Sequence, residues 1–133
     1  MAITTKKWTF AEYLIYDDGT GARYELVNGD LVCMALGTGE HGDISEFLNE
    51  VFKAEIKRTS RSWTSKDMKI GIQSPRSSRD TSRVPDVVVL PLEQWEGLKK
   101  RESVITLNEA PPYTGGRSRQ PNYSGSRLSC KTY

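Results

Sequence analysis

The sequence has few cysteines, one histidine and no long apolar run. Cys33 and Cys130, the two cysteines among 133 residues, are far apart and match no zinc-binding or redox spacing. Such sparse cysteine usage favours a reducing compartment, and no stretch approaches the length of a membrane span. The first residues are polar and aromatic, unlike the apolar core of a signal peptide. These absences predict a soluble, cytoplasmic protein without a membrane partner.

A strong excess of one charge is also missing from most of the chain. The net charge is +2, from 19 basic and 17 acidic residues. Four of the bases and none of the acids lie in residues 113–133, so 15 bases and 17 acids remain in residues 1–112 and their net charge is −2. This balance excludes a body that binds nucleic acid by charge alone. The length allows one domain with a hydrophobic core.

One acid stands at the start of the most apolar stretch. Residues 84–90 read Val-Pro-Asp-Val-Val-Val-Leu, a β-branched run that predicts a strand buried on both faces. Asp86 would lie at the entrance of this strand. Since burying a charge without a partner is costly, a functional role such as metal binding is one explanation. A structural role is the other, because Asp after Pro is common in turns and strand entries.

Two local signals organise the first third of the chain. Thr9 and Glu12 form a capping box that predicts a short helix. Asn-Gly at positions 28 and 29, between apolar runs, predicts a hairpin of residues 24–27 and 30–34. A two-residue turn places Glu25 opposite Val32, on the face that Leu26 does not share. Glu25 is either a solvated strand carboxylate or a site residue.

The clearest helix follows the only histidine. Six apolar residues fall at helical spacing after residue 42, and we expect them to pack on the sheet: Ile44, Phe47, Leu48, Val51, Phe52 and Ile56. Asp43 and Glu46 predict a capping box at its start. His41 would then lie in a Gly-flanked loop before the helix. It is either solvated or, because its pKa range suits proton transfer, catalytic or in contact with phosphate.

The rest of the patterned region alternates strand, loop and helix signals. Met68, Ile70 and Ile72 alternate as in a strand over residues 68–73, and residues 74–83 form a polar, basic loop. Its arginines are either solvated or in contact with phosphates. Residues 92–98 predict a short helix and residues 104–107 a short strand. Strand and helix signals thus both occur along the chain, as in an α/β protein.

Several of these pieces together resemble one known family. A Trp-Thr-x-x-Glu-Tyr opening, Tyr-Glu-Leu-x-x-Gly-x-Leu-Val, Glu-His-Gly before a helix, Val-Pro-Asp-Val-Val-Val and Ala-Pro-Pro occur in this order over residues 8–112. The combination resembles the Uma-two type restriction endonucleases of the PD-(D/E)XK nuclease superfamily.

The resemblance implies a restriction-endonuclease-like core, with a central mixed sheet flanked by helices. It makes Asp86 the metal-binding aspartate and Glu25 the upstream acid of the same site, whereas His41 stays a catalytic candidate on its pKa range alone. The implied cofactor is Mg²⁺ or Mn²⁺, which polarises the scissile phosphate and activates water. The implied substrate is DNA, and a homodimer is a further expectation because nucleases that cut both strands often act as dimers.

The last 21 residues depart from the family. After Ala-Pro-Pro the family has an apolar strand with a Glu and then a helix with Asp, Lys and Tyr, whereas residues 113–133 are rich in Gly, Ser and Arg. A one-base shift of reading frame is one account of the change. With suitable codons for residues 114–132, the neighbouring frame reads LVVEVVSQTTRVADYRAKR. We therefore expect a truncated nuclease domain over residues 1–112, an aberrant and disordered basic tail over 113–133, and impaired activity.

An alternative is a genuine disordered tail that contacts nucleic acid or nothing. Without catalysis, the chain would be a DNA-binding or self-associating remnant of the nuclease fold.

Overall fold

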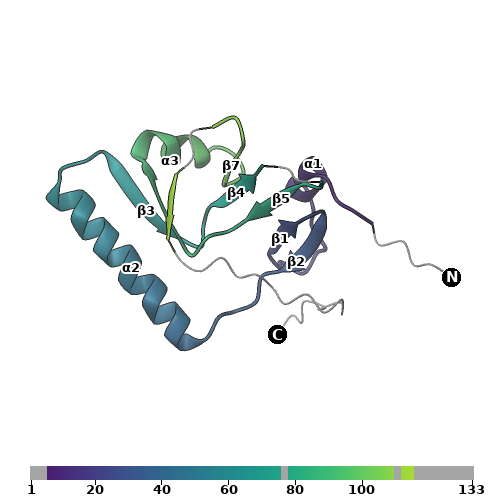
Figure 1. Ribbon diagram of the computed structural model, residues 1–133, viewed down its shortest axis with the longest axis horizontal. Coiled ribbons are helices and arrows are strands. Elements are labelled where there is room, and N and C mark those ends of the chain that lie inside the picture. Colours follow the sequence, from purple (N-terminus) through teal and green to yellow (C-terminus); the bar gives the residue numbers. More distant parts are fainter. Residues whose placement is uncertain (1–5, 76–77, 110–111, 116–133) are drawn as a thin grey trace.

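The computed structural model describes residues 6–75, 78–109 and 112–115, which contain three helices and eight strands (Figure 1). In chain order these elements are α1 (Phe10–Leu14), β1 (Tyr24–Val27), β2 (Asp30–Cys33), α2 (Gly39–Arg58), β3 (Trp63–Asp67), β4 (Gly71–Ser74), β5 (Thr81–Arg83), β6 (Val87–Pro91), α3 (Leu92–Leu98), β7 (Val104–Ile105) and β8 (Tyr113–Gly115). None of the helices in these ranges is long and apolar enough to cross a bilayer.

The strands form two sheets. Five strands follow the order β2-β1-β5-β4-β7, and three follow the order β3-β6-β8. Strands β4 and β7 pair in parallel, and the other pairs are antiparallel. The predicted α/β (α+β) class with a mixed sheet and flanking helices is confirmed. Its division into two sheets was not predicted, and β5 lies within what the sequence presented as a basic loop.

The chain passes between the two sheets at Met68. This residue has a φ of 51°, in the left-handed region that β-strands do not use. Its N–H donates to the carbonyl of Asp86 at 2.9 Å, which ties this bend to the start of β6. The strand predicted over residues 68–73 is therefore confirmed only for residues 71–73, which lie in β4, and Ile70 is buried as its alternation predicted.

Strand β6 is the buried strand that its sequence predicted. Val87, Val88 and Leu90 are each at most 1% exposed. The main apolar cluster consists of Ile70, Val88, Leu90, Leu98 and Ile105. Strand β6 is paired on both sides, with β3 and with β8.

Helices α2 and α3 cover opposite faces of the three-stranded sheet. Ser65 on β3 bonds to Asn49 of α2, and the next residue, Lys66, lies over the ring of Trp95 on α3. Successive strand residues point to opposite faces, so the two helices lie on opposite sides (Figure 1).

Helix α2 begins five residues earlier than the sequence predicted. Its N-cap is Thr38, whose hydroxyl accepts a hydrogen bond from the N–H of His41 at 3.1 Å. The predicted capping box at Asp43 is therefore wrong, and His41 lies in the first helical turn and not in a loop. The glycines at positions 39 and 42 concealed this start, because glycine is a poor helix former.

The apolar residues of α2 do not all face the sheet. Leu48, Phe52 and Ile56 are half-buried, whereas the other three predicted contacts are exposed: Ile44 at 53%, Phe47 at 64% and Val51 at 44%. The buried residues of the helix are Ser45 and Asn49. The prediction that one apolar face packs on the sheet is thus wrong for half of its members.

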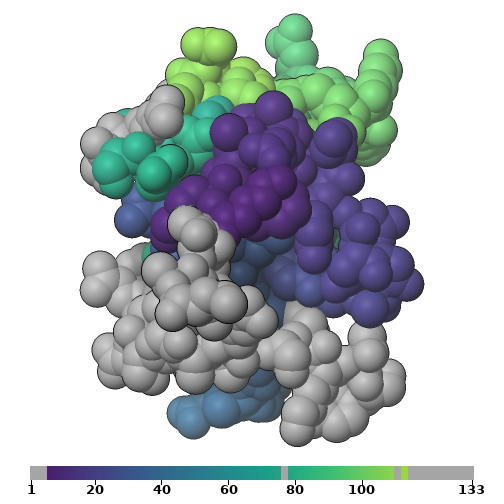
Figure 2. Space-filling model, turned by 90° about the vertical axis from the view of Figure 1, so that its right-hand side faces the viewer, coloured from purple at the N-terminus to yellow at the C-terminus, as the bar shows by residue number. Residues whose placement is uncertain are grey.

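The hairpin has the predicted register. Val27 pairs with Asp30 and Glu25 with Val32, and Asn28 and Gly29 have the positive φ angles of a two-residue turn. The capping box of Thr9 with Glu12 is also confirmed. Figure 2 shows the N-terminal segment, in purple, packed beside the segment around residue 80; there the N–H of Phe10 donates to Asp80.

The chain continues as a strand beyond residue 112. Tyr113–Gly115 forms β8 and pairs with β6, so three residues extend the sheet where the sequence predicted the start of a disordered tail. The rest of the predicted tail, from residue 116, lies outside the described residues, and the predicted boundary at 112 stays a prediction.

Candidate functional site

Asp86 lies where the sequence placed it, directly before β6. Its side chain is 13% exposed. Its backbone carbonyl is held by the Met68 N–H, so the residue is fixed both by the strand that follows it and by the bend between the sheets. The carboxylate is therefore held in place at the edge of the core.

The structure brings His41 to Asp86, 45 positions away in the sequence. The imidazole Nε2 lies 3.0 Å from the Asp86 Oδ1, and 28% of the histidine side chain is exposed. Nε2 is itself buried and makes no hydrogen bond within the described residues, so the two atoms are close without the alignment of a hydrogen bond. The contact is an ion pair when the imidazole is protonated.

Two polar anchors fix the helix that carries His41. The Thr38 hydroxyl caps the first turn, and the buried Ser65 hydroxyl donates to the Asn49 Oδ1 at 2.6 Å. The second bond joins α2 to β3, the strand next to β6. The imidazole is therefore set against Asp86 by elements fixed to the same sheet.

Glu25 makes a different contact. Its carboxylate lies 3.3 Å from the Arg83 Nε, and the two side chains are 21% and 29% exposed. The pairing of Leu26 with Ser82 brings β1 and β5 together at this point. Glu25 is thus not a solvated strand carboxylate, because it pairs with Arg83. It does not contact Asp86 in this arrangement, although Arg83 is only three residues before Asp86 in the chain.

The described residues do not complete a metal site. No group of three His, Cys, Asp or Glu side chains able to hold a metal ion occurs among residues 6–75, 78–109 and 112–115. A carboxylate oxygen at Asp86 suits Mg²⁺ or Mn²⁺, and the neighbouring Nε2 is a buried polar atom that makes no hydrogen bond in the part of the chain that the structure describes. One carboxylate and one imidazole nevertheless leave the donor set incomplete.

A cluster of basic residues surrounds Lys66, and no pattern in the sequence predicts it. Burial lowers the pKa of this lysine, and the charges of Lys53, Lys69 and Lys99 lower it further. The four residues are scattered along the chain and have no common spacing, so only the fold reveals them. Lys66 lies on β3, opposite Val88 of β6.

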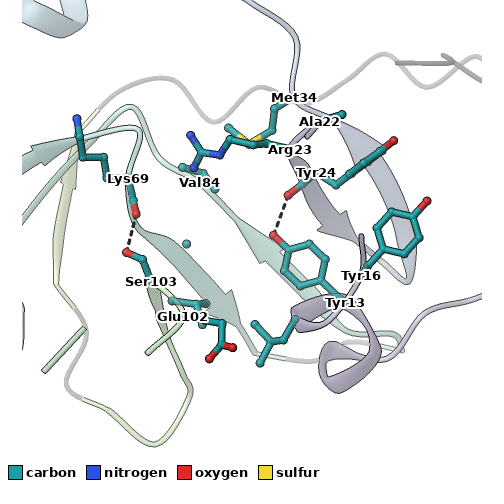
Figure 3. Close-up of a pocket in the computed structure, with 13 residues that line it drawn as sticks. Tyr13, Tyr16, Ala22, Arg23, Tyr24, Met34, Lys69, Val84, Glu102 and Ser103 are labelled. Carbon is teal, nitrogen blue, oxygen red and sulfur yellow. Dashed lines mark hydrogen bonds between the residues drawn. The ribbon is translucent and has the colours of Figure 1, made fainter. Parts of the chain in front are cut away.

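A cavity of about 270 Å³ lies on the five-stranded sheet (Figure 3). Its wall includes Tyr13, Tyr24, Arg23 and Val84, but none of the three predicted site residues. The Tyr13 hydroxyl donates to the carbonyl of Tyr24 at 2.8 Å, as Figure 3 shows. Burial raises the pKa of Tyr13, and the negative charge of Glu25 raises it further. The cavity therefore borders the surroundings of Glu25 but does not contain the pair formed by His41 and Asp86.

Residues 10–113 match the model of the Uma2 family, which is described as "Putative restriction endonuclease". The chain belongs to this family. Comparison with curated proteins and with solved structures gave no match. The resemblance inferred from the motifs over residues 8–112 is confirmed, with nearly the same limits.

All three predicted site residues lie inside the Uma2 match. Glu25, His41 and Asp86 fall within residues 10–113, and residues 114–133 fall outside it. The mixed α+β architecture fits the restriction-endonuclease-like fold expected of a Uma2 protein. A nuclease-like function is therefore the one that the family supports.

Proposed function

We propose that this chain is a metal-dependent nuclease of the Uma2 family that acts on DNA phosphodiester bonds and holds only part of its active site. Asp86 is the proposed metal ligand, and His41 the proposed catalytic partner beside it. One observation carries the proposal: the two residues, selected separately from the sequence, lie 3.0 Å apart at the start of β6.

The pair has a chemistry of its own. A carboxylate beside an imidazole limits the orientation of the ring, so His41 can hold a proton at Nε2 or contact a phosphate oxygen. The partial burial of both side chains strengthens this interaction relative to a pair in water. These roles need no group beyond the two side chains.

Glu25 is the second proposed metal ligand. Its carboxylate now lies against Arg83, so it would have to exchange the guanidinium for a metal ion. Moving the Arg83 guanidinium away would leave the Glu25 carboxylate without its positively charged partner until a metal ion binds. This exchange is the part of the proposed site that requires the largest rearrangement.

The proposed missing half is the strand encoded in the neighbouring frame. Strand β8 pairs with β6 so that Gly115 lies opposite Val87, and a strand continued in this register sets its next position opposite Asp86. In the product of the neighbouring frame, the glutamate of LVVEVV comes one residue after the position that would lie opposite Asp86. The register of β8 therefore supports a frame-restored chain whose added strand runs beside Asp86, with its glutamate one position away from the residue opposite Asp86.

Cleavage of supercoiled plasmid with Mg²⁺ or Mn²⁺ tests the proposal on the chain as it exists. We expect slow, metal-dependent nicking that Asp86→Asn abolishes. Asp43→Asn is the matched control, because Asp43 is an exposed acid on the same helix as His41. Nicking that survives Asp86→Asn would refute the assigned role of Asp86.

The alternative is a remnant that binds DNA or associates with itself without cutting. The exposed apolar residues of α2 favour self-association. A gel-shift assay at several salt concentrations tests DNA binding, because binding driven by phosphate contacts must weaken as salt rises. Binding without nicking, also in the frame-restored chain, would favour the remnant.

A further inference from the structure

One face of α2 is left uncovered by the rest of the described chain. Ile44, Phe47 and Val51 lie along it, with 53%, 64% and 44% of their surfaces exposed. At 100° per residue they fall within roughly 60° of arc, and roughly 150° around the helix from the buried Ser45 and Asn49. They therefore point away from the sheet and cannot contribute to the core of this copy.

The uncovered face continues in both directions along the helix. Glu40, Ile44, Phe47, Val51, Ala54 and Arg58 follow one another at alternating steps of four and three residues, and all six are exposed. This spacing is that of the seam between two coiled helices. The seam is acidic at its N-terminal end, apolar in the middle and basic at its C-terminal end.

We propose that a second copy of this chain docks on this face, with the two α2 helices antiparallel about a two-fold axis at the level of Asn49. In this register Phe47 faces Val51 of the second copy and Ile44 faces its Ala54. The symmetry makes each contact twice. With a rise of about 1.5 Å per residue, Phe47 and Val51 lie about 3 Å on either side of the axis, so the largest side chains meet at the centre.

Charge complementarity selects this orientation. The antiparallel register sets Glu40 against Arg58 of the second copy at both ends of the seam, whereas a parallel pair would set like charges together. Arg58 also bonds to Glu55 within its own helix, and both of these side chains are more than half exposed. Such an exposed pair is worth little, so Arg58 remains able to contact the second copy. The register brings Asp43 toward the Glu55 of the second copy at the rim, where water screens both charges.

The size of the seam limits the affinity. A helix of 20 residues is about 30 Å long, and one helix pair buries less than the roughly 800 Å² per partner of a standard interface. The dimer is therefore a weak, reversible one, formed at micromolar or higher concentrations. It does not depend on cleavage of DNA, so failure of the nuclease proposal leaves it intact.

Sedimentation of the full chain over the micromolar to millimolar range measures the association. We expect a reversible monomer–dimer equilibrium, and a dissociation constant at least about tenfold higher for Phe47→Ser. Leu36→Ser is the matched control, since Leu36 is 97% exposed but lies outside α2, and it should leave the constant unchanged. A chain that stays monomeric throughout, or a dimer that Phe47→Ser does not weaken, would overturn the proposal.

A charge exchange tests the register. Glu40→Arg and Arg58→Glu should each associate more weakly than the parent chain, because each sets like charges together at both ends of the seam. Mixed in equal amounts, they should associate as tightly as the parent chain, since the mixed dimer restores both opposite-charge pairs. Circular dichroism establishes that each variant is as helical as the parent. A mixture that associates no better than either variant alone would rule out the antiparallel register.

Discussion

Replacing Asn49 with alanine should destabilise the fold by removing the anchor between α2 and the sheet. Asn49 is 9% exposed and Ser65 is fully buried, and their side chains share a hydrogen bond of 2.6 Å. The substitution leaves the Ser65 hydroxyl in the core without its partner, which costs about 1–3 kcal/mol. For a chain of this length, that loss lowers the melting temperature by roughly 3–6 °C per kcal/mol.

A double-mutant cycle separates the bond from its surroundings. Urea unfolding gives the free energies of unfolding for the parent chain, Asn49→Ala, Ser65→Ala and the double variant. Because the second substitution removes the hydroxyl that the first one orphans, the double variant should lose less than the sum of the single losses, by about 0.5–3 kcal/mol. Strictly additive losses would show that the bond does not hold α2 to the sheet.

Two further predictions concern the core and acid stability. Leu90→Ala should lower the free energy of unfolding by about 2–5 kcal/mol, because the Leu90 side chain is fully buried in the main cluster. Leu92 is 42% exposed, so Leu92→Ala should lower it by less than about 1 kcal/mol. Equal losses of stability in thermal unfolding would refute the assigned core. Burial of Glu109 acts to raise its pKa, but hydrogen bonds from Thr106 and Arg101 outweigh this effect and hold the pKa below 4.5. The Glu109 carboxylate therefore stabilises the fold above pH 4.5, and this stabilisation is lost as the pH falls through the folded-state pKa. Glu109→Gln should therefore be less stable than the parent chain at neutral pH and equally stable in acid, and a stability difference that did not change with pH would contradict this.

Local signals in the sequence predicted the elements that local chemistry determines. Asn-Gly at positions 28 and 29 set both the turn and the register of the first hairpin, and Thr9 with Glu12 set the first cap. The apolar run after Asp86 predicted the buried strand. In each case the residues that decide the structure are neighbours in the chain.

The failures have a common cause in tertiary contacts. Met68 carries no turn signal, and its left-handed φ accompanies a hydrogen bond to Asp86, 18 residues away. The apolar residues of α2 do not reveal which face of the helix packs on the sheet. The sheet presents the buried hydroxyl of Ser65 at this contact, so the polar Asn49 lies against it. The pairs His41 with Asp86 and Glu25 with Arg83 join distant segments, so the sequence could nominate residues but not their partners.

DNA cleavage by a frame-restored chain tests the central claim, that Asp86 and His41 are half of a nuclease site. The variant carries the neighbouring frame after Tyr113, and its cleavage rate with Mg²⁺ is compared with that of the present chain and of the same variant with Asp86→Ala. We predict that the restored chain cuts DNA much faster than the present one and that Asp86→Ala abolishes the cutting. A restored chain that folds but does not cut, or that cuts equally well without Asp86, would contradict the claim.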